Sequence, residues 1–378
     1  MSERKDVCER KLLRVVKIDN VVEHGNADSL ELAIVGGWQV CAKKGQFKVG
    51  DIAMYAEVDA LLPLDHPEFS FLEGRSQYTV DGKNYSRVKT IKLRKELSQG
   101  ILFDYFGSAN VGDDLTELYG VIKYEAVPEP VPGGGNGVKK SRAFPSFIRK
   151  TDQERVQNIV NAFNAAVATG EEFEISVKLD GSSFTAYIKD GKVGVCSRNI
   201  ELQLEPETWS LWKQLTVFVS EVKKHGFKYA KWKKGVQPEA NAFTALFNEL
   251  ELEQKLKAIK EHCGWNLAIQ GEMVGPSIQG NFEGVDKNRL FVYSVFDIDA
   301  QKYVLPETAY AIVKRMGLEY VPVISYRATL PNTIAEVLAM ADGPSALGGK
   351  YREGTVWKSL DRDFSFKVIS NEYLILEK

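Results

Sequence analysis

Short apolar runs separated by turn residues make up the first third of the chain. Four of them are rich in Val, Ile, Leu and aromatic residues and have the length of β-strands: LLRVVKIDNVV, LELAIVGGWQVCA, DIAMYAEVDALLP and GILFDYF. The breaks between them contain Gly-Asn, Gly-Gly and Pro, which favour turns. Strands this short predict a small closed β-barrel of about five strands.

The remainder of the chain mixes strand-like and helix-like periods. Apolar runs of strand length recur at EISVKL, SFTAYIKDGKVGVCS, NLAIQGEMVG, RLFVYSVFDID, EGTVWKS and FSFKVIS. Three stretches between them are predicted to be helical: 207–224, 239–262 and 306–316. A further helix is predicted through VQNIVNAFNAAVA, because Thr151 and Glu154 have the spacing of a capping box. The pattern therefore predicts an α+β chain with a β-barrel in front.

One segment separates these two parts. Residues 126–141, AVPEPVPGGGNGVKKS, are rich first in proline and then in glycine, so an extended piece is followed by a flexible one. We predict a barrel domain at 1–126, a linker at 127–140 and a larger domain at 141–378. A chain of 378 residues is long for a single hydrophobic core, which agrees with two domains.

Composition limits the cellular location and the kinds of partner expected for the chain. No apolar run approaches the roughly 20 residues of a membrane helix, and the charged start MSERKDVCERKLLRVVK has no apolar signal core. The four cysteines form no Cys-x-x-Cys pair, which argues against a disulfide framework and a zinc site. We expect a cytoplasmic protein without a membrane partner, while a nuclear or organellar location stays open. The net charge is only −2, so a nucleic-acid partner requires local basic patches.

A lysine at the end of a predicted strand raises the question of chemistry. Lys178 ends the run EISVKL and is followed by Leu179, Asp180 and Gly181. Alone, a lysine beside an Asp-Gly turn is more often a surface residue next to a hairpin than a nucleophile. Five motifs follow it in order, each in or beside a predicted strand: Ser197-Arg198-Asn199, Gly271-Glu272, Phe296-Asp297-Ile298, Glu353-Gly354-x-Val356-x-Lys358 and Phe366-Lys367. Each motif alone fits an ordinary core or surface position, but their joint order argues against that interpretation.

The ordered set resembles the motifs of the covalent nucleotidyltransferase superfamily, which contains ATP- and NAD-dependent polynucleotide ligases and mRNA capping enzymes. The resemblance implies that the amine of Lys178 attacks the α-phosphorus of ATP, expels pyrophosphate and forms a lysine–AMP phosphoramidate. The amine must be neutral to attack, and free lysine titrates at about 10.4. We expect partial burial and nearby cations, a metal and Arg198 among them, to lower the pKa of Lys178.

The resemblance also assigns roles to the other motif residues. It implies that Arg198 contacts the ribose, that Glu272 lies at the ribose and metal edge, and that Phe296 stacks on adenine. Glu353 would be the carboxylate required for metal-assisted adenylylation, and Lys367 would bind the α-phosphate. Three carboxylates would together hold the water shell of Mg²⁺ or Mn²⁺: Asp180, Glu272 and Glu353.

The last motif departs from the pattern of the superfamily, in which many members carry Lys-x-Lys. Residues 365–369 read SFKVI. Ser365 replaces the first lysine if Lys367 is the second, and Ile369 replaces the second lysine if Lys367 is the first. Lys358 is a candidate to supply the missing phosphate contact, so we place it among the nucleotide-binding residues.

The order of the parts favours one branch of the superfamily. DNA ligases and capping enzymes usually carry an OB domain after the last motif, whereas only eleven residues follow Lys367 in this sequence. Residues 24–40, HGNADSLELAIVGGWQV, resemble the start of OB-type tRNA-binding domains, so the OB-like barrel is expected in front. This order, together with 87–103 and 144–158, is similar to the Naegleria/Deinococcus type of RNA ligase.

This resemblance implies an ATP-dependent RNA ligase that joins 3′-OH and 5′-phosphate RNA ends, at nicks in duplex RNA. We expect the chain to act as a monomer. ATP is the expected donor because the four-cysteine zinc site of NAD-dependent ligases is missing. Three alternatives stay open: an ATP-dependent DNA ligase without its usual C-terminal domain, a GTP-using capping-type enzyme, and a non-catalytic RNA-binding protein with this fold.

Two basic segments are candidates for holding RNA. In the barrel part, strand alternation places some cations on one face: Arg87, Lys89, Lys92 and Arg94. In the larger part, lysines are interleaved with aromatic residues: Lys231, Lys233 and Lys234. A solvated strand edge or helix face is the competing interpretation of each segment.

Overall fold

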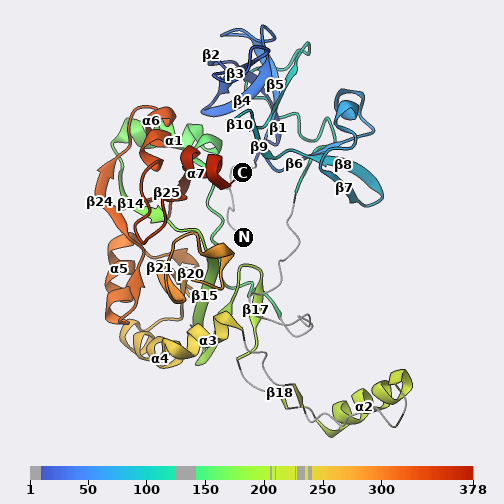
Figure 1. Ribbon diagram of the computed structural model, residues 1–378. Helices are drawn as coiled ribbons and strands as arrows, with labels where there is room; N and C mark the ends of the chain where they lie inside the picture. Colours follow the sequence, from blue (N-terminus) through green and yellow to red (C-terminus); the bar gives the residue numbers. More distant parts are fainter. Residues whose placement is uncertain are drawn as a thin grey trace.

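The computed structural model describes residues 10–124 and 142–377, with the exception of 205–206, 209, 226, 228–234 and 237–240. The predicted linker at 127–140 lies outside the described residues, and so do Lys231, Lys233 and Lys234. Figure 1 shows the β-rich N-terminal part beside a larger part of sheets and helices. Among the helices that the structure describes, none is both long and apolar enough to cross a bilayer.

The N-terminal part contains more strands than the five or so that the apolar runs predicted. Its strands form a three-stranded sheet of β1 (Leu13–Lys17), β5 (Ile52–Ala56) and β11 (Ile101–Asp104), and a second of β2 (Asn20–Glu23), β3 (Leu30–Val35) and β4 (Trp38–Lys43). A four-stranded sheet has the order β12 (Ile122–Lys123), β6 (Ala60–Pro63), β8 (Lys83–Arg87) and β7 (Gln77–Val80). The hairpin of β9 (Thr90–Leu93) and β10 (Glu96–Gln99) completes the barrel domain.

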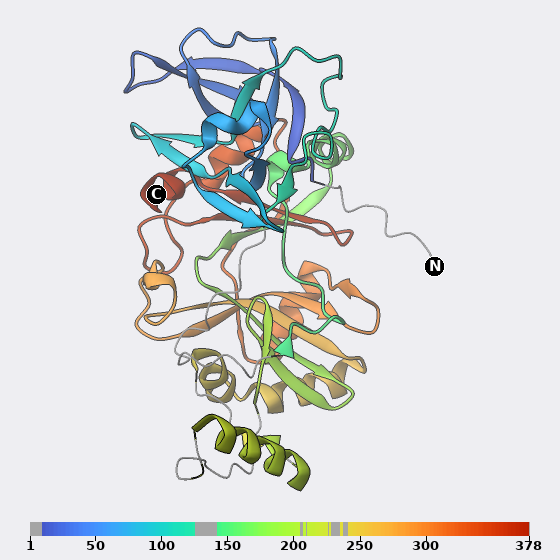
Figure 2. The ribbon, with the colours of Figure 1, turned by 90° about the vertical axis from the view of Figure 1, so that its right-hand side faces the viewer.

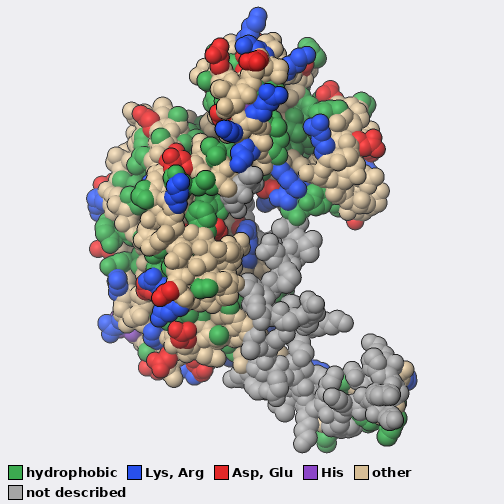
Figure 3. Space-filling model, in the orientation of Figure 1, with side chains coloured by type: hydrophobic (Ala, Val, Ile, Leu, Met, Phe, Trp, Pro, Cys, Tyr) green, Lys and Arg blue, Asp and Glu red, His purple; other side chains and the backbone are tan. Residues whose placement is uncertain are grey.

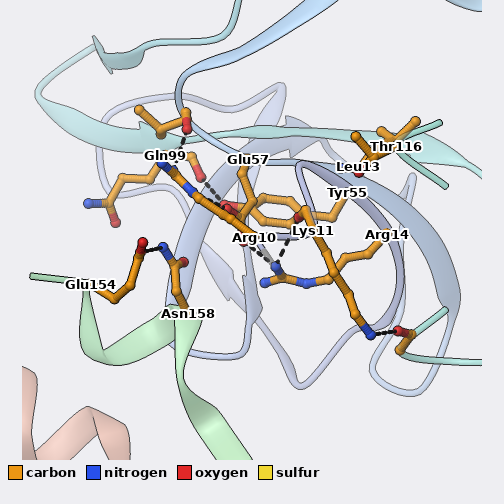
Figure 4. A network of polar contacts seen from close by, with 12 residues as sticks. Arg10, Lys11, Leu13, Arg14, Tyr55, Glu57, Gln99, Thr116, Glu154 and Asn158 are labelled. Atoms are coloured by element: carbon orange, nitrogen blue, oxygen red, sulfur yellow. Dashed lines mark hydrogen bonds and ion pairs between the residues drawn. The ribbon is translucent and has the colours of Figure 1, made fainter. Parts of the chain in front are cut away.

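A charged network is built into the wall of the barrel (Figure 4). Glu57 is buried, with 1% of its surface exposed, and it pairs with two arginines. Arg10 Nε donates to one carboxylate oxygen at 2.8 Å, and Arg14 pairs with the other. Because the buried carboxylate is fully partnered, its desolvation is offset.

The larger part consists of two antiparallel sheets. The large sheet has the order β13 (Arg142–Ala143), β17 (Ile200–Leu202), β16 (Lys192–Cys196), β15 (Ser182–Lys189), β20 (Leu267–Val274), β21 (Arg289–Asp297) and β22 (Lys302–Tyr303), with β23 (Glu319–Tyr320) parallel to β21. The small sheet has the order β24 (Val323–Thr329), β14 (Glu172–Lys178), β25 (Gly354–Ser359) and β26 (Ser365–Ile369). A short pair joins β18 (Glu207–Thr208) to β19 (Gly235–Val236).

Helices cover these sheets. The large sheet shares its apolar core with α3 (Ala242–Glu249), α4 (Leu252–Cys263) and α5 (Pro306–Arg315). The small sheet shares its own core with α1 (Val160–Thr169) and α6 (Ile334–Ala341). The remaining α-helices are α2 (Leu211–His225) and α7 (Asn371–Glu377). Short 3₁₀ helices lie at Pro67–Leu72, Val156–Asn158 and Gln279–Asn281.

Three of the helix predictions need correction. The helix predicted at 239–262 is two helices, because Glu251 adopts a left-handed conformation with φ of 52° between them. The helix predicted from 207 begins at Leu211. The predicted capping box does not form, because α1 begins only at Val160 with Ile159 as an N-cap that makes no side-chain hydrogen bond, and Glu154 Oε2 accepts from Asn158 Nδ2 at 3.0 Å instead.

The barrel packs on the larger part at two places. The first place is near the C-terminus, which Figure 2 shows between the barrel and the larger part. There Leu97 of β10 joins Ile369, Tyr373 and Leu374 in a buried apolar cluster. At the second place, the Arg155 guanidinium lies over the Trp38 ring, 5.5 Å from its centroid.

Candidate active site

Lys178 ends β14 at the point where the chain passes from the small sheet to the large one. β14 pairs with β24 and β25, whereas the next strand, β15, pairs with β16 and β20. The Asp-Gly step is therefore a crossing between two sheets and not the turn of a hairpin, which was the competing interpretation. A Cβ atom on Gly181 would collide with the carbonyl oxygen of Met273, so glycine lets β15 approach β20 closely.

The nearest charged partner of Lys178 comes from the neighbouring strand. Gly354 is the register partner of Lys178, and Glu353 directly precedes it. Lys178 Nζ lies 2.5 Å from Glu353 Oε1, and the two side chains are 25% and 16% exposed. A half-buried amine is thus fixed in an ion pair at the junction of the two sheets.

The pKa of Lys178 is shifted in the direction opposite to our expectation. Burial alone would lower this pKa, but the carboxylates of Glu353, Glu272 and Asp180 outweigh it and raise the pKa above its ordinary value. The expected lowering was wrong for the protein alone, because three nearby carboxylates stabilise the ammonium form. A ligand that neutralises these carboxylates would favour the neutral amine.

Glu272 is the most perturbed carboxyl group near Lys178. It lies on β20, opposite Ser183 of β15. Burial raises the pKa of Glu272 to about 8, with Lys178 opposing the shift and the neighbouring carboxylates of Glu353 and Asp180 adding to it. Within the described part of the chain, no three His, Cys, Asp or Glu side chains converge closely enough to ligate an ion directly.

Asp180 is held from two sides. Its backbone N–H donates to Glu283 Oε1 at 3.0 Å, and its Oδ2 accepts from the Tyr373 hydroxyl at 2.9 Å. Glu283 is buried and its second oxygen accepts from Ser345 Oγ at 2.7 Å. Glu283 and Tyr373 are not among the residues predicted from the sequence. Neither belongs to the motifs, and only the three-dimensional fold brings them to Asp180.

Lys367 lies on β26, one strand beyond Gly354, with Val356 as its register partner. Burial, together with repulsion from Lys178 and Arg155, lowers the pKa of Lys367 to about 8. Ile369 packs in the apolar cluster with Leu97 of the barrel. The two positions at which the motif lysine could be missing therefore differ in their surroundings. Ser365 is half-buried in polar surroundings and accepts from the Gln153 side chain at 3.4 Å, whereas Ile369 is packed among apolar side chains.

Lys358 lies on β25, which pairs with β14, the strand that ends at Lys178. It is 8% exposed, its Nζ donates to the Tyr293 carbonyl, and its register partner on β14 is Glu174. Glu174 is 2% exposed and accepts from the Tyr320 hydroxyl at 3.0 Å. Burial lowers the pKa of Lys358 to about 8 despite the Glu174 carboxylate. In this conformation Lys358 binds the two sheets together, and its contact with a nucleotide stays a prediction.

A small polar cavity adjoins Glu272. Its lining residues come from the segment before α1 and from β15, β20 and the end of β16: Phe144, Lys150, Thr151, Asp152, Ser183, Thr185, Arg198 and Gln270. Arg198 is exposed and pairs with Asp152 at 2.9 Å. Gln270 is buried, donates to the Arg149 carbonyl at 2.8 Å, and has no hydrogen-bond partner for Oε1. The sequence contains one signal for Ser183, Thr185 and Gln270: they are polar residues at alternate positions of predicted strands that lie beside the motifs.

Phe296 does not line this cavity. It is 1% exposed, its ring packs edge-on against Tyr303 with centroids 5.1 Å apart, and the Arg149 guanidinium lies 5.8 Å from its centroid. A base can stack on this ring only after the segment containing Arg149 moves. The predicted adenine platform is core in this conformation.

The basic residues of the barrel have different surroundings. Arg87 pairs with Asp59 at 2.6 Å, and its guanidinium lies 3.6 Å from the Tyr124 ring centroid. Lys89, Lys92 and Arg94 are all exposed, and Lys92 Nζ in addition donates to the Ile375 carbonyl at 2.9 Å. On the face shown in Figure 3, Lys and Arg side chains are spread over the barrel with Asp and Glu among them.

Comparison with known proteins covers both parts of the chain. A family model described as RNA ligase matches residues 171–369, and one described as an OB-fold domain matches residues 12–105. No curated protein matches the sequence.

Solved structures of Naegleria gruberi RNA ligase are similar to almost the whole chain. An aspartate-to-alanine mutant without ligand is 33% identical, with 97% of each chain covered and a TM-score of 0.71. A lysine-to-methionine mutant with AMP and Mn is 32% identical, with 98% of this chain and 99% of that chain covered and a TM-score of 0.73. A lysine-to-alanine mutant with ATP and Mn is also 32% identical, with 97% and 99% covered and a TM-score of 0.73.

Proposed function

The chain belongs to the RNA ligase family and is an ATP-dependent RNA ligase that uses a divalent metal, and from this premise we propose that it joins 3′-OH and 5′-phosphate RNA ends at nicks in a duplex. The predicted family and the predicted α+β fold with an OB domain in front are confirmed. Family membership decides against the capping-type and non-catalytic alternatives.

The ion pair between Lys178 and Glu353 carries the proposed first step. The neutral Nζ of Lys178 attacks the α-phosphorus of ATP, an N–P bond forms, and the bond to pyrophosphate breaks. The proton lost from the ammonium must leave before attack, and Glu353 at 2.5 Å is placed to accept it. The product is lysine–AMP.

Two further transfers complete the proposed cycle. The 5′-phosphate of the RNA attacks the phosphorus of lysine–AMP, which frees Lys178 and leaves AMP joined to the RNA end through a pyrophosphate bond. The 3′-OH of the neighbouring strand then attacks the activated 5′-phosphate, a phosphodiester bond forms and AMP leaves. Lys178 therefore returns unchanged after each turnover.

The positions of the other motif residues support one orientation of the bound nucleotide. Lys367 and Lys178 would bracket the α-phosphate on the small sheet. Glu272 and Arg198 would face the ribose on the large sheet, and the cavity beside Gln270 would take the base. Successive residues on one face of a strand are about 6.6 Å apart, so the step from Glu272 to Gln270 suits the distance from ribose to base.

The acidic groups around Lys178 fit a divalent cation. Asp180, Glu272 and Glu353 all act electrostatically on this lysine, and together they carry more negative charge than one ammonium balances. Mg²⁺ keeps several of its waters and binds few carboxylates directly, which agrees with carboxylates that do not converge on one point. When bound, the cation would neutralise charge on the α-phosphate.

The barrel is the part proposed to hold RNA beside the break. We retain the boundaries 1–126, 127–140 and 141–378 as proposed domains, and we propose that a single chain acts alone. The exposed Lys89 and Arg94 are the stronger candidates of the barrel set for phosphate contacts.

The test uses the full chain with α-labelled ATP and Mn²⁺ or Mg²⁺, followed by nicked RNA, nicked DNA and single-stranded RNA. We expect label on the denatured protein and sealing of nicked duplex RNA. The Lys178→Met variant should take no label. Lys192→Met, which changes an exposed lysine at the start of β16, should behave like the unmodified chain. Preferential sealing of DNA or of single strands would contradict the proposed substrate, and label on Lys178→Met would contradict the proposed nucleophile.

A further inference from the structure

The helix α7 touches both the barrel and the charged site at the junction of the two sheets, which we call the cleft and define by Lys178, Asp180, Glu272, Glu353 and Lys367. On the barrel side, Leu97 of β10 packs against Tyr373 and Leu374 in one buried cluster, and Lys92 Nζ donates to the carbonyl of Ile375 at 2.9 Å. Figure 1 shows α7 beneath the β9–β10 hairpin. The start of the helix is anchored as well, because Ser370 Oγ donates to Asp342 Oδ1 at 2.7 Å. Barrel contacts therefore hold the middle and end of α7, and the larger part holds its start.

On the cleft side, α7 reaches a carboxylate of the site. The Tyr373 hydroxyl donates to Asp180 Oδ2 at 2.9 Å, and Tyr373 is only 3% exposed. Its ring packs edge-on against Phe282, with centroids 4.9 Å apart, so the hydroxyl has little freedom to leave. A hydrogen bond to an ionised carboxylate is stronger and more directional than one between neutral groups.

The backbone of Asp180 is fixed independently. Its N–H donates to Glu283, a buried carboxylate that Ser345 also holds. With the backbone fixed by Glu283 and one side-chain oxygen contacted by Tyr373, the orientation of the Asp180 carboxylate is determined. Asp180 in turn lies close enough to influence the pKa of Lys178.

We propose that Tyr373 is a positioning residue that couples the docking of the barrel on α7 to the orientation of Asp180 beside Lys178. The inference rests on the proposed function, in which Asp180 belongs to the adenylylation site. It assigns the barrel a part in the step that precedes any contact with RNA. Loosening the barrel contact should therefore weaken adenylylation even when no RNA is present.

The test measures adenylylation of the full chain by labelled ATP, without RNA, across a range of Mn²⁺ concentrations. Tyr373→Phe removes only the hydroxyl, and outer-sphere changes of this kind typically reduce metal affinity or activity about 10-fold or more. We expect Tyr373→Phe to need about 10-fold more Mn²⁺ for half-maximal labelling, with the KM for ATP little changed at saturating Mn²⁺. Leu97→Ala should shift the same curve in the same direction by less, although Leu97 touches no group of the cleft.

A second measurement is independent of activity. Mn²⁺ that binds the folded chain raises its melting temperature, and we expect this rise, measured without nucleotide, to be smaller in both variants. Tyr326→Phe is the matched control, because it removes a hydroxyl from an exposed tyrosine of β24. This control should match the unmodified chain in both measurements.

The outcomes separate this inference from the proposed function. Failure of the unmodified chain to take label would contradict the proposed function itself. Normal labelling of the unmodified chain, with Mn²⁺ curves of Tyr373→Phe and Leu97→Ala that superimpose on it, would overturn the coupling alone. If Tyr373→Phe melts too early to assay, Leu97→Ala still decides, because an unchanged Mn²⁺ curve in that variant removes the barrel from the first step.

Discussion

The barrel and the cleft of the larger domain use charged side chains in opposite ways. In the barrel, buried Glu57 has two arginine partners, and Arg87 has both Asp59 and the Tyr124 ring. In the cleft, three carboxylates surround Lys178, and the pKa values of Glu272 and Lys367 are both moved to about 8. Matched charges hold one conformation, whereas unmatched and desolvated charges are ready to interact with a charged ligand.

In a chain of low net charge, the partners of the charged groups indicate function better than the number of charges does. Total charge is nearly balanced at −2, and counting charges along the sequence does not separate the two regions. The partners of these charges do separate the two regions. The barrel groups have fixed counterions, whereas the three carboxylates of the cleft share the amine of Lys178.

The largest effect is expected from removing the ion-pair partner of Lys178, the proposed nucleophile. Glu353→Gln should slow adenylylation by about 100-fold or more, because a preorganised charged group of the site is lost. The residual reaction should also move to lower pH, since Glu353 raises the pKa of Lys178 and its loss favours the neutral amine at a given pH. Single-turnover labelling between pH 6 and 9 measures both. A residual rate whose pH profile moves to higher pH would contradict the assigned direction.

Two buried charged groups, Lys358 and Glu174, should matter for stability. Lys358→Met removes both the donor to the Tyr293 carbonyl and the cation whose charge acts on the buried Glu174 carboxylate, and a buried charge without a compensating charge typically costs about 3–5 kcal/mol. Arg327→Met is the matched control on the same sheet, because Arg327 pairs with Glu172 in the open, with the two side chains 67% and 38% exposed, and exposed pairs contribute at most about 1 kcal/mol. Urea unfolding compares the two. Equal losses of the free energy of unfolding would contradict the structural role assigned to Lys358.

The third prediction concerns the charge of Lys367. Its pKa of about 8 means that the ammonium is present below this pH and is lost above it. ATP binding without metal should therefore weaken as the pH rises from 7 to 9, by up to about tenfold per unit above the pKa if binding requires the charged form. Lys367→Arg keeps its charge throughout this range and should flatten the curve. Parallel curves for both proteins would assign the pH dependence to another group.

Local patterns predicted much of the fold, and tertiary contacts explain where they were wrong. Apolar runs found many of the strands of both domains, since side-chain period is a local property, but they missed β7 and β24. The sequence could not reveal that β14 and β15 belong to different sheets, because strand pairing depends on distant segments. The capping box at Thr151 and Glu154 was wrong because α1 begins only at Val160, while Tyr293 and Asn158 donate to the Thr151 and Glu154 side chains.

The candidate site shows the same limit. The motifs identified Lys178, Glu272 and Glu353, and the structure brings their charges together. They did not predict that Phe296 is buried, because a phenylalanine in a strand can face a ligand or a core. They also gave the wrong direction for the pKa of Lys178, which depends on how closely carboxylates from other strands approach it.

The smallest effects are expected within the basic set of the barrel, which the structure divides. Arg87 is committed to Asp59 and Tyr124, whereas Lys89 and Arg94 are exposed, and Arg94 lies in the β9–β10 turn with φ of 46°. Each phosphate contact contributes a slope of about 0.7 to 0.9 to the dependence of log affinity on log salt. Lys89→Ala and Arg94→Ala should each lower the slope for RNA by about that amount.

Arg87→Ala should instead lower the melting temperature and leave the salt slope unchanged, because its charge already has a counterion. Lys48→Ala, an exposed lysine of the barrel outside the predicted set, is the control for a general loss of charge. Filter binding of nicked duplex RNA between 50 and 300 mM salt distinguishes the variants. A reduced slope for Arg87→Ala alone would reverse the division, and it would mean that RNA displaces Asp59. The barrel would then resemble the cleft, with a charge that exchanges partners on binding.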